Sequence, residues 1–243
     1  MEKHVSDIIE WLQSQVKKAN VKGLLVGVSG GLDSAVVAYL IKRAFPDDSL
    51  GVIMPLKSSE TDMKDALSVV EKSGLEQMTI DLTETHQSLF SEIQNQLTTS
   101  AQDNNPLTDA NLRARLRMST LYAIASHRHY MVVGTDNASE WYTGYFTKYG
   151  DGGVDILPLI EYTKHEVRQM AKCLGVPQEV IDKKPSADLW VGQTDEDEMG
   201  TSYDHIDAYL QGEQIPKEDR KVIEQMHERT AHKRNVATPF IFR

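Results

Sequence analysis

Residues 27–34 read Gly-Val-Ser-Gly-Gly-Leu-Asp-Ser, and this stretch decides the fold because it turns an apolar strand directly into a helix. The strand is expected at residues 24–28 (LLVGV), and apolar side chains at helical spacing follow over residues 35–45. At such a turn the first N–H groups of the helix have no partner, the helix dipole adds partial positive charge, and glycine lets an anion approach the main chain. The stretch therefore predicts a phosphate-binding loop.

Three interpretations of this loop compete on the residues alone. A Walker A loop needs Lys before its final Ser, whereas this chain has Asp33, which would repel phosphate unless a divalent cation lay between them. A nucleophile elbow fits Gly27 to Gly31, but only 26 residues precede it, most of them in a helical pattern, whereas that fold places several strands there. The third interpretation is a turn without a ligand, and Ser-Gly-Gly-x-Asp-Ser is a more specific pattern than such a turn requires.

The rest of the first half alternates between strand and helix signals, which favours parallel strands joined by helices. Further strands are expected at 50–54, 77–82 and 130–133, and helices at 61–71 and about 111–127. The polar stretch 97–109 is expected to be a surface loop. With 243 residues and 40% hydrophobic content, the chain can bury one substantial core, so we expect a single α/β domain over residues 1–243.

Composition excludes several function classes. The net charge of -10 argues against nucleic acid as a partner, because nucleic-acid binding normally needs a basic surface. No stretch reaches the roughly 18 consecutive apolar residues of a membrane span, and the N-terminus lacks the apolar region of a secretory signal. The single cysteine, Cys173, allows no internal disulfide and no Cys-based zinc cluster. These features predict a cytoplasmic protein that does not associate with membranes.

Residues 134–164 form the second informative region, because they follow an expected strand and should lie at the same edge of the sheet as the phosphate loop. Thr135 is placed to contact nucleotide, and Glu140 could complete a magnesium site with Asp33. The aromatic, glycine-rich part up to residue 153 is suited to a mobile loop that covers substrate. Lys164 opens a helix, where the dipole disfavours a cation, so we expect it to have an anionic partner.

Two further groups of charged residues are expected to be mainly structural. Arg113 and Arg117 share one face of the long helix while Arg115 points nearly the opposite way, so the three cannot grip one ligand, and two of them are expected to be solvated or ion-paired. The acidic run 195–198 is expected to be a solvated loop rather than a metal site.

The hexapeptide at residues 29–34 resembles the loop of the PP-loop ATP pyrophosphatase superfamily, whose members cleave ATP between its α and β phosphates. The resemblance implies a Rossmann-like, doubly wound α/β fold, with a mainly parallel sheet, helices on both faces, and ATP at the carboxyl ends of the strands. One branch, the bacterial ammonia-dependent NAD synthetases, is similar along nearly the whole chain. The motifs that carry this similarity are SGGLDSA, NLRARLRM, GT-x-N-x-SE, GYFTKYGDGG, P-L-I-x-x-TK, KKPSADLWVGQTDE, YDHIDAYL and AHKR.

That family adenylates the carboxylate of deamido-NAD with ATP and Mg²⁺, releases pyrophosphate, and lets ammonia displace AMP to give NAD. The resemblance implies a magnesium site at Asp33 and Glu140, and catalytic roles for Asp33 and Lys164. The implied ATP-binding positions are Gly27, Val28, Ser29, Gly30, Gly31, Leu32, Asp33, Ser34, Thr135, Lys164 and Ser186. The implied deamido-NAD positions are Arg115, Lys148, Asp155, His232 and Lys233. Many relatives have Thr where this chain has Ser186, and both residues supply a hydroxyl.

The resemblance further implies a homodimer, with the deamido-NAD site at the subunit interface. Ammonia rather than glutamine is expected as the nitrogen donor, because glutamine-using relatives carry an added glutaminase domain. Two alternatives remain open. One is a different amidating adenylate-former, similar to GMP synthetase, and the other is a nucleotide-binding sensor that does not turn ATP over.

Overall fold

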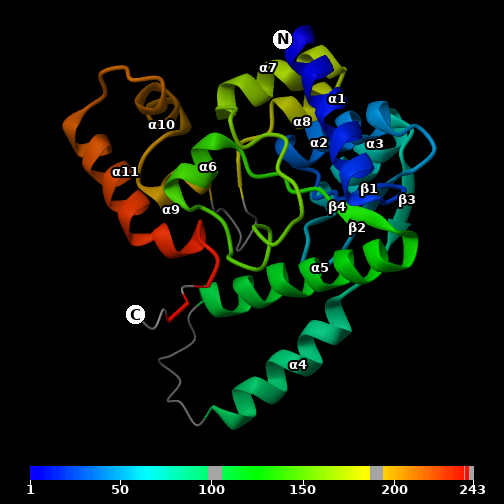
Figure 1. Cartoon of the computed structure of the whole chain (residues 1–243). Coiled ribbons are helices and arrows are strands. Elements are labelled where there is room, and N and C mark those ends of the chain that lie inside the picture. Colours follow the sequence, from blue (N-terminus) through cyan, green and yellow to red (C-terminus); the bar gives the residue numbers. More distant parts are fainter. Residues whose placement is uncertain (98–105, 187–193, 238, 241–243) are drawn as a thin grey trace.

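The computed structural model describes residues 1–97, 106–186, 194–237 and 239–240, and at its centre is a four-stranded parallel sheet (Figure 1). The spatial order of the strands is β3-β2-β1-β4. The strands are β1 (Gly23–Gly27), β2 (Ser49–Ile53), β3 (Glu76–Thr79) and β4 (Tyr130–Val132). Every neighbouring pair runs parallel, which confirms the strand positions and direction expected from the alternating sequence signals.

Helices cover both faces of this sheet, because its buried strands are apolar on both sides. In β1, Leu24 and Val26 pack into one core with α1 (Glu2–Ala19), α2 (Leu32–Ala44), α3 (Glu60–Ser73) and α7 (Lys164–Leu174). Leu25 points to the other core, against α5 (Pro106–Arg128). The arrangement is the expected α/β architecture with helices on both faces.

The strand order reverses between β1 and β4, and this reversal places the functional site. The chain first winds outward from β1 to β2 and β3, then returns through α4 (Thr83–Gln96) and α5 to lay β4 on the other side of β1. In open α/β sheets, ligands bind at the carboxyl ends of strands where the order reverses. The residues that follow β1 and β4 are the phosphate loop and residues 133–137.

The second half of the chain adds a cluster of helices beside the sheet (Figure 1). It contains α6 (Ala138–Thr143), α9 (Asp195–Met199), α10 (Tyr203–Leu210), α11 (Lys217–Arg229) and the 3-10 helix η1 (Ala231–Lys233), while α8 (Gln178–Ile181) follows α7. The cluster has its own small core of Met199, Tyr203, Ile206 and Ile223. A single-domain organisation of the chain stays a prediction.

Two elements differ from the sequence expectation. The helix α4 was not expected, and among its described side chains only that of His86 is buried. The expected loop 97–109 is helical from Pro106 onward, because proline is favoured in the first turn and Asp109 both complements the dipole and pairs with Arg113 at 3.0 Å. Residues 98–105 of that expected loop lie outside the described part.

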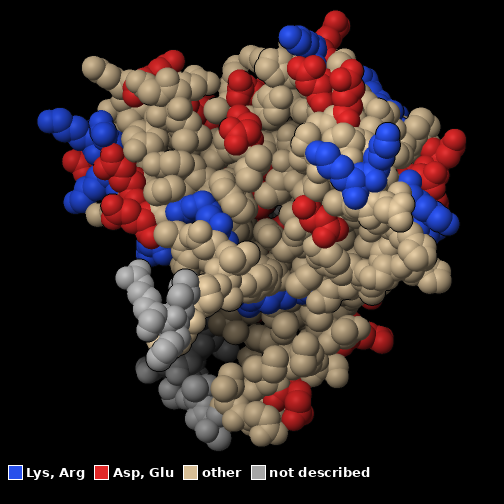
Figure 2. Space-filling view, viewed as in Figure 1, with Lys and Arg blue, Asp and Glu red and all other residues tan. Residues whose placement is uncertain are grey.

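The surface carries mixed charge. On the face in Figure 2, acidic and basic side chains are intermingled over the described residues. None of the helices among the described residues combines the length and apolarity that a bilayer span requires.

Candidate functional site

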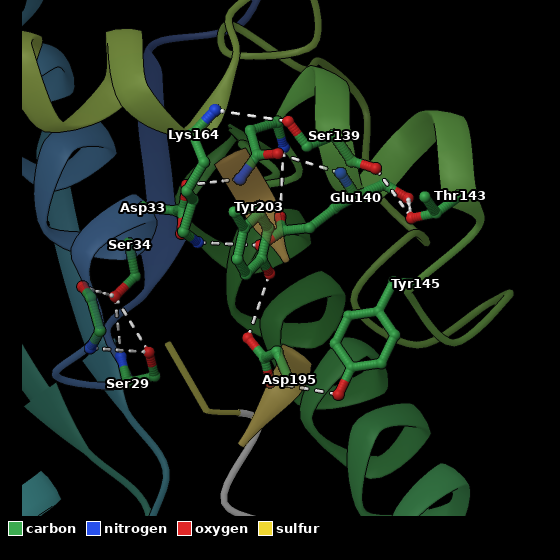
Figure 3. A network of polar contacts seen from close by, with 12 residues as sticks. Ser29, Asp33, Ser34, Ser139, Glu140, Thr143, Tyr145, Lys164, Asp195 and Tyr203 are labelled. Atoms are coloured by element: carbon green, nitrogen blue, oxygen red, sulfur yellow. Dashed lines mark hydrogen bonds and ion pairs between the residues drawn. The ribbon is translucent and has the colours of Figure 1, made fainter. Parts of the chain in front are cut away.

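The phosphate loop is held in shape by its two serines (Figure 3). The Ser34 hydroxyl lies 3.0 Å from the Ser29 hydroxyl, accepts from the Ser29 N–H at 3.2 Å and donates to the Gly31 carbonyl at 3.0 Å. Gly31 is the N-cap residue of α2, and no side chain among the described residues accepts a hydrogen bond from the first N–H groups of the helix. These N–H groups are therefore open to a ligand. Gly30 has a φ of 85°, a conformation that favours glycine.

Lys164 lies between the two carboxylates that were expected to bind metal. Its Nζ is 2.5 Å from Asp33 Oδ2 and 3.0 Å from Glu140 Oε1. The three residues come from the first turns of α2, α6 and α7, which converge at the carboxyl ends of β1 and β4 (Figure 3). The expectation that Lys164 has an anionic partner is confirmed, and both Asp33 and Glu140 are its partners.

Burial sets the electrostatics of this cluster. Lys164 is 4% exposed, and although burial lowers its pKa, the two adjacent carboxylates outweigh burial and raise the pKa above its ordinary value. For Glu140, burial raises the pKa to about 7, against the opposing effect of Lys164. The cluster therefore holds the Lys164 cation between the carboxyl groups of Asp33 and Glu140.

Two polar residues hold the cluster in place, and sequence reasoning assigned them no role. The buried Asn137 donates from Nδ2 to Asp33 Oδ1 at 2.9 Å and forms a reciprocal capping box with Glu140. Asp207 of α10 accepts the Lys164 N–H at 3.3 Å and the His165 N–H at 2.8 Å, and also accepts the Ser139 hydroxyl. The spacing of Asn137 and Glu140 is itself a capping signature, whereas nothing local in the sequence pairs Asp207 with α7.

Replacing Asp207 by alanine is expected to destabilise the protein by about 2–3 kcal/mol, because two N–H groups of α7 and a buried hydroxyl lose their acceptor. Urea unfolding measures the change in the free energy of unfolding. Asp204→Ala, an exposed position on the same helix, is the matched control. Equal stability of the two variants would contradict the proposed contribution of Asp207.

The acidic run 195–198 is partly different from the expectation. It forms the short helix α9, and although Glu196, Asp197 and Glu198 are exposed, Asp195 is buried. Asp195 accepts hydroxyls from Tyr203 and Tyr145, each at 3.1 Å (Figure 3). The expectation of a solvated loop was wrong for Asp195, because the fold brings two tyrosines from other segments onto it.

Tyr203 connects this buried carboxylate to the central cluster. Its hydroxyl is 3.1 Å from Glu140 Oε1, and its ring lies 4.8 Å from Lys164 Nζ. Burial and the surrounding carboxylates raise the pKa of Tyr203 well above its ordinary value, so the phenol stays protonated. Tyr203 is thus a third contact that fixes Glu140.

A cavity of about 590 Å³ opens over this cluster. Its lining combines the phosphate loop, the apolar end of β2, one face of α5 and the turn after β4. The predicted residues Thr135, Lys164, Ser186 and Lys233 also line it. The cavity is therefore lined on one side by the phosphate loop and on the other by lysines and carboxylates, as expected for a site that holds a polyphosphate.

The carboxylates of the cavity fit a small divalent cation. Asp33 and Glu140 present oxygens to the same point, and the nearby Asp136 is 4% exposed with an Oδ2 that has no hydrogen-bond partner among the described residues. No group of three or more potential protein ligands converges in the described part of the chain. Two carboxylates suit Mg²⁺, which takes most of its ligands from phosphates and water.

Four of the five positions expected to bind deamido-NAD come together around residues 144–150. Arg115 donates to the Lys148 carbonyl, and Lys148 Nζ donates to the carbonyls of His232 and Asn235 at 2.6 and 2.8 Å. Lys233 Nζ donates to the carbonyls of Gly144 and Phe146. The residues near the C-terminus are thereby tied to the glycine-rich loop.

Asp155, the fifth expected position, accepts from the Tyr122 hydroxyl at 3.0 Å and from the Val132 N–H at 2.8 Å. These contacts fix the end of β4. The roles of all five positions in binding deamido-NAD remain predictions.

The arginines of α5 divide as their spacing predicts. Arg113 is buried and paired with Asp109, while Arg117 donates to the carbonyls of Met54 and Leu56 at the end of β2. Arg115 is exposed on the opposite side. Arg113 is ion-paired and Arg115 is exposed, so two of the three are ion-paired or solvated as expected, and Arg117 fastens α5 to the sheet.

Comparisons with known proteins find one family along nearly the whole chain. The model of the family described as NAD synthase matches residues 4–237. The NH3-dependent NAD+ synthetase of Alkaliphilus oremlandii is 55% identical over 239 residues, which span 97% of this chain and 96% of that protein. Among solved structures, an NMN synthetase from Francisella tularensis is 38% identical with a TM-score of 0.93, covering 99% of this chain and 98% of the other. The NH3-dependent NAD synthetase of Campylobacter jejuni is 27% identical with a TM-score of 0.79, covering 99% of each.

Proposed function

The chain belongs to the NAD synthase family, and from this premise we propose that it uses ATP to join ammonia to the nicotinate carboxylate of deamido-NAD. The products are NAD, AMP and pyrophosphate. One observation carries the proposal. The phosphate loop, Asp33, Glu140 and Lys164 converge at the carboxyl ends of β1 and β4, in a chain of which 97% aligns with an NH3-dependent NAD+ synthetase.

The residues divide the first step between them. The N-terminus of α2 and the loop N–H groups receive the phosphate chain of ATP, and Lys164 supplies positive charge where the pyrophosphate leaving group develops negative charge. The substrate carboxylate is itself the nucleophile, so no side chain of the protein needs to form a covalent intermediate. Positioning and charge stabilisation account for this chemistry.

We propose that Asp33 and Glu140 hold Mg²⁺ together with phosphate oxygens. When bound, this ion would supply charge that neutralises the phosphates. Hydrogen bonds from Asn137 to Asp33 and from Tyr203 to Glu140 fix the two carboxylates. Asp33 stands where a Walker A loop has lysine, and its function here would be to bind the metal. The other residues that the sequence predicts to bind ATP or deamido-NAD are proposed in the same roles.

Ammonia is the proposed nitrogen donor. A glutamine-using enzyme commonly needs a nucleophilic cysteine. Cys173 lies in the last turn of α7 and packs against the core that α7 shares with α1, α2 and α3. The dipole at a helix C-terminus disfavours a thiolate. The cytoplasmic location stays a prediction.

Cys173→Ala is expected to retain ammonium-dependent NAD synthesis within about twofold, because a small, partly buried side chain is replaced by a smaller one away from the cavity. Wild-type protein with ammonia-free glutamine is expected to form negligible NAD. Chromatographic detection of NAD measures both reactions. Glutamine-dependent synthesis that disappears in Cys173→Ala would overturn the assignment of ammonia.

We also propose that the active form is a homodimer with the deamido-NAD site partly at the subunit interface. The surface around α4 supports this, because Leu89 and Leu97 are 41% and 55% exposed and Leu107 at the start of α5 is 42% exposed. Light scattering under assay conditions measures the oligomeric state. An active monomer at working concentration would contradict the dimer.

Nicotinate mononucleotide is a second candidate substrate. The closer superposition on the NMN synthetase than on the NAD synthetase of C. jejuni favours it, and the chemistry is the same amidation of a nicotinate carboxylate on a smaller acid. The phosphate loop and Lys164 would act identically in either case.

The experiment that tests the function supplies ATP, Mg²⁺, ammonium and one of three acids. These are deamido-NAD, nicotinate mononucleotide and xanthosine monophosphate. We expect the highest kcat/KM for deamido-NAD and no amidation of xanthosine monophosphate. A higher kcat/KM for the mononucleotide would assign the second candidate, and preferred amidation of xanthosine monophosphate would reject both.

A further inference from the structure

Lys183, whose side chain is 24% exposed, forms an ion-pair cluster next to the central site. Its Nζ lies 2.5 Å from Asp62 Oδ1 and 3.0 Å from Asp65 Oδ2. The side chains of Asp62 and Asp65 are 9% and 12% exposed, and both come from the start of α3. One cation therefore neutralises only part of the charge of two carboxylates.

This cluster lies directly behind the phosphate loop. A Cβ added to Gly30 would be 2.6 Å from the Asp62 carbonyl oxygen and 3.0 Å from the Asp65 Cβ, so the loop is pressed against this turn of α3. Asp62 and Lys183 line the same cavity as Ser29 and Gly31. Asp62 thus lines the cavity in which a polyphosphate is expected, and Asp65 lies behind the loop that would hold it. Without a cation, the two carboxylates would repel the phosphates.

The two carboxylates are not equivalent. Asp62 Oδ2 accepts the N–H and hydroxyl of Ser59 in the capping box that begins α3. Among the described residues, the Asp65 carboxylate has only Lys183 as a hydrogen-bond partner. Asp65 can therefore be neutralised without disturbing the start of the helix.

We propose that Lys183 is a positioning residue for ATP, which neutralises Asp62 and Asp65 behind the phosphate loop and holds residues 183–186 at the mouth of the cavity. The proposal rests on the proposed function in taking ATP as the ligand of the loop. Lys183 is assigned no contact with the phosphates. Its effect is exerted through the two carboxylates.

A second ion pair between the same two segments provides a matched control. Lys72, near the end of α3, pairs at 2.9 Å with Glu179 of α8, four residues before Lys183. Both side chains are about half exposed, at 51% and 52%. Lys72 and Glu179 do not line the cavity, so breaking this pair removes an attachment between the same segments without changing the charge behind the loop.

The test measures KM for ATP from pyrophosphate release. Lys183→Met is expected to raise KM for ATP about tenfold, with kcat and KM for deamido-NAD changed less than about threefold. The double variant Lys183→Met/Asp65→Asn is expected to return KM for ATP to within about threefold of wild type, because loss of one carboxylate together with the lysine restores the net charge of the wild-type cluster. Asp65→Asn, Lys183→Arg and the control Lys72→Met are each expected to stay within about threefold of wild type.

Two results would overturn the proposal. An unchanged KM for ATP in Lys183→Met would show that the charge behind the loop does not matter. A raised KM that Asp65→Asn fails to rescue would show that Lys183 contacts the phosphates directly. Thermal melting checks that each variant folds. If Lys183→Met does not fold, Lys183→Gln, which keeps a polar group, takes its place in the single and double variants.

Isothermal titration calorimetry measures the Kd for ATP of the wild type and of the same single and double variants, without turnover. This separates the proposal from the proposed function. A wild type that binds ATP but forms no NAD would reject the function while the binding cycle still tests Lys183.

Discussion

Replacement of Lys164 by methionine is expected to reduce the rate of pyrophosphate release by at least about a thousandfold. The change removes positive charge at the point where the leaving group develops negative charge. It also leaves Asp33 and Glu140, 13% and 14% exposed, facing each other without the lysine between them. Breaking a buried ion pair by removing one partner costs about 3–5 kcal/mol, so a lower melting temperature is expected as well. Rapid-quench measurement of pyrophosphate in a single turnover reports the step directly.

Lys172→Met is the matched control, because Lys172 is an exposed lysine on the last turn of the same helix α7. It is expected to leave the single-turnover rate within about twofold of wild type. A Lys164→Met protein that melts cooperatively and releases pyrophosphate at a rate similar to the control would remove Lys164 from the chemistry.

Asp33→Asn and Glu140→Gln are each expected to slow adenylation by about two orders of magnitude or more. Each substitution removes a ligand charge while keeping the side-chain volume, so the fold should persist. The Mg²⁺ concentration that gives half-maximal rate should rise in both variants. This second readout separates loss of a metal ligand from a general loss of activity.

The control for the two carboxylates is Glu161→Gln, an exposed carboxylate in the segment that leads to α7. Its rate and Mg²⁺ dependence are expected to match wild type. If Asp33→Asn or Glu140→Gln keeps both the wild-type rate and the wild-type Mg²⁺ dependence, that residue does not belong to the metal site.

The features that the sequence predicted are those encoded locally. The turn from β1 to α2 is specified by Gly30, Gly31 and the serines that bond across it. Lys164 could be expected to pair with an anion because a lysine in the first turn of a helix opposes the dipole. The convergence of Asp33 and Glu140 followed from one rule, that parallel strands end at the same edge of the sheet.

The features that were missed depend on contacts between distant segments. Tyr203 reaches Glu140 across 63 positions, and Asp207 reaches the Lys164 N–H across 43. The burial of Asp195 depends on Tyr145, 50 positions away. The expected mobility of the loop up to residue 153 stays a prediction, although Lys233 and Lys148 tie that loop to the C-terminal segment.

The helix α4 escaped prediction for a different reason. Its apolar residues Leu89, Phe90 and Ile93 are few in a mainly polar segment, and of its described side chains only His86 is buried on this subunit. The same property makes α4 relevant to the proposed dimer, because a second subunit would cover the surface that this subunit leaves exposed.

In the proposed reaction, the substrate carboxylate attacks the α-phosphate of ATP at the loop of residues 27–34. Deamido-NAD labelled with ¹⁸O in its carboxylate tests it directly, with mass spectrometry of the phosphorus-containing products. We expect one ¹⁸O atom in AMP for each NAD formed and none in pyrophosphate. Formation of ADP with ¹⁸O in orthophosphate would contradict it.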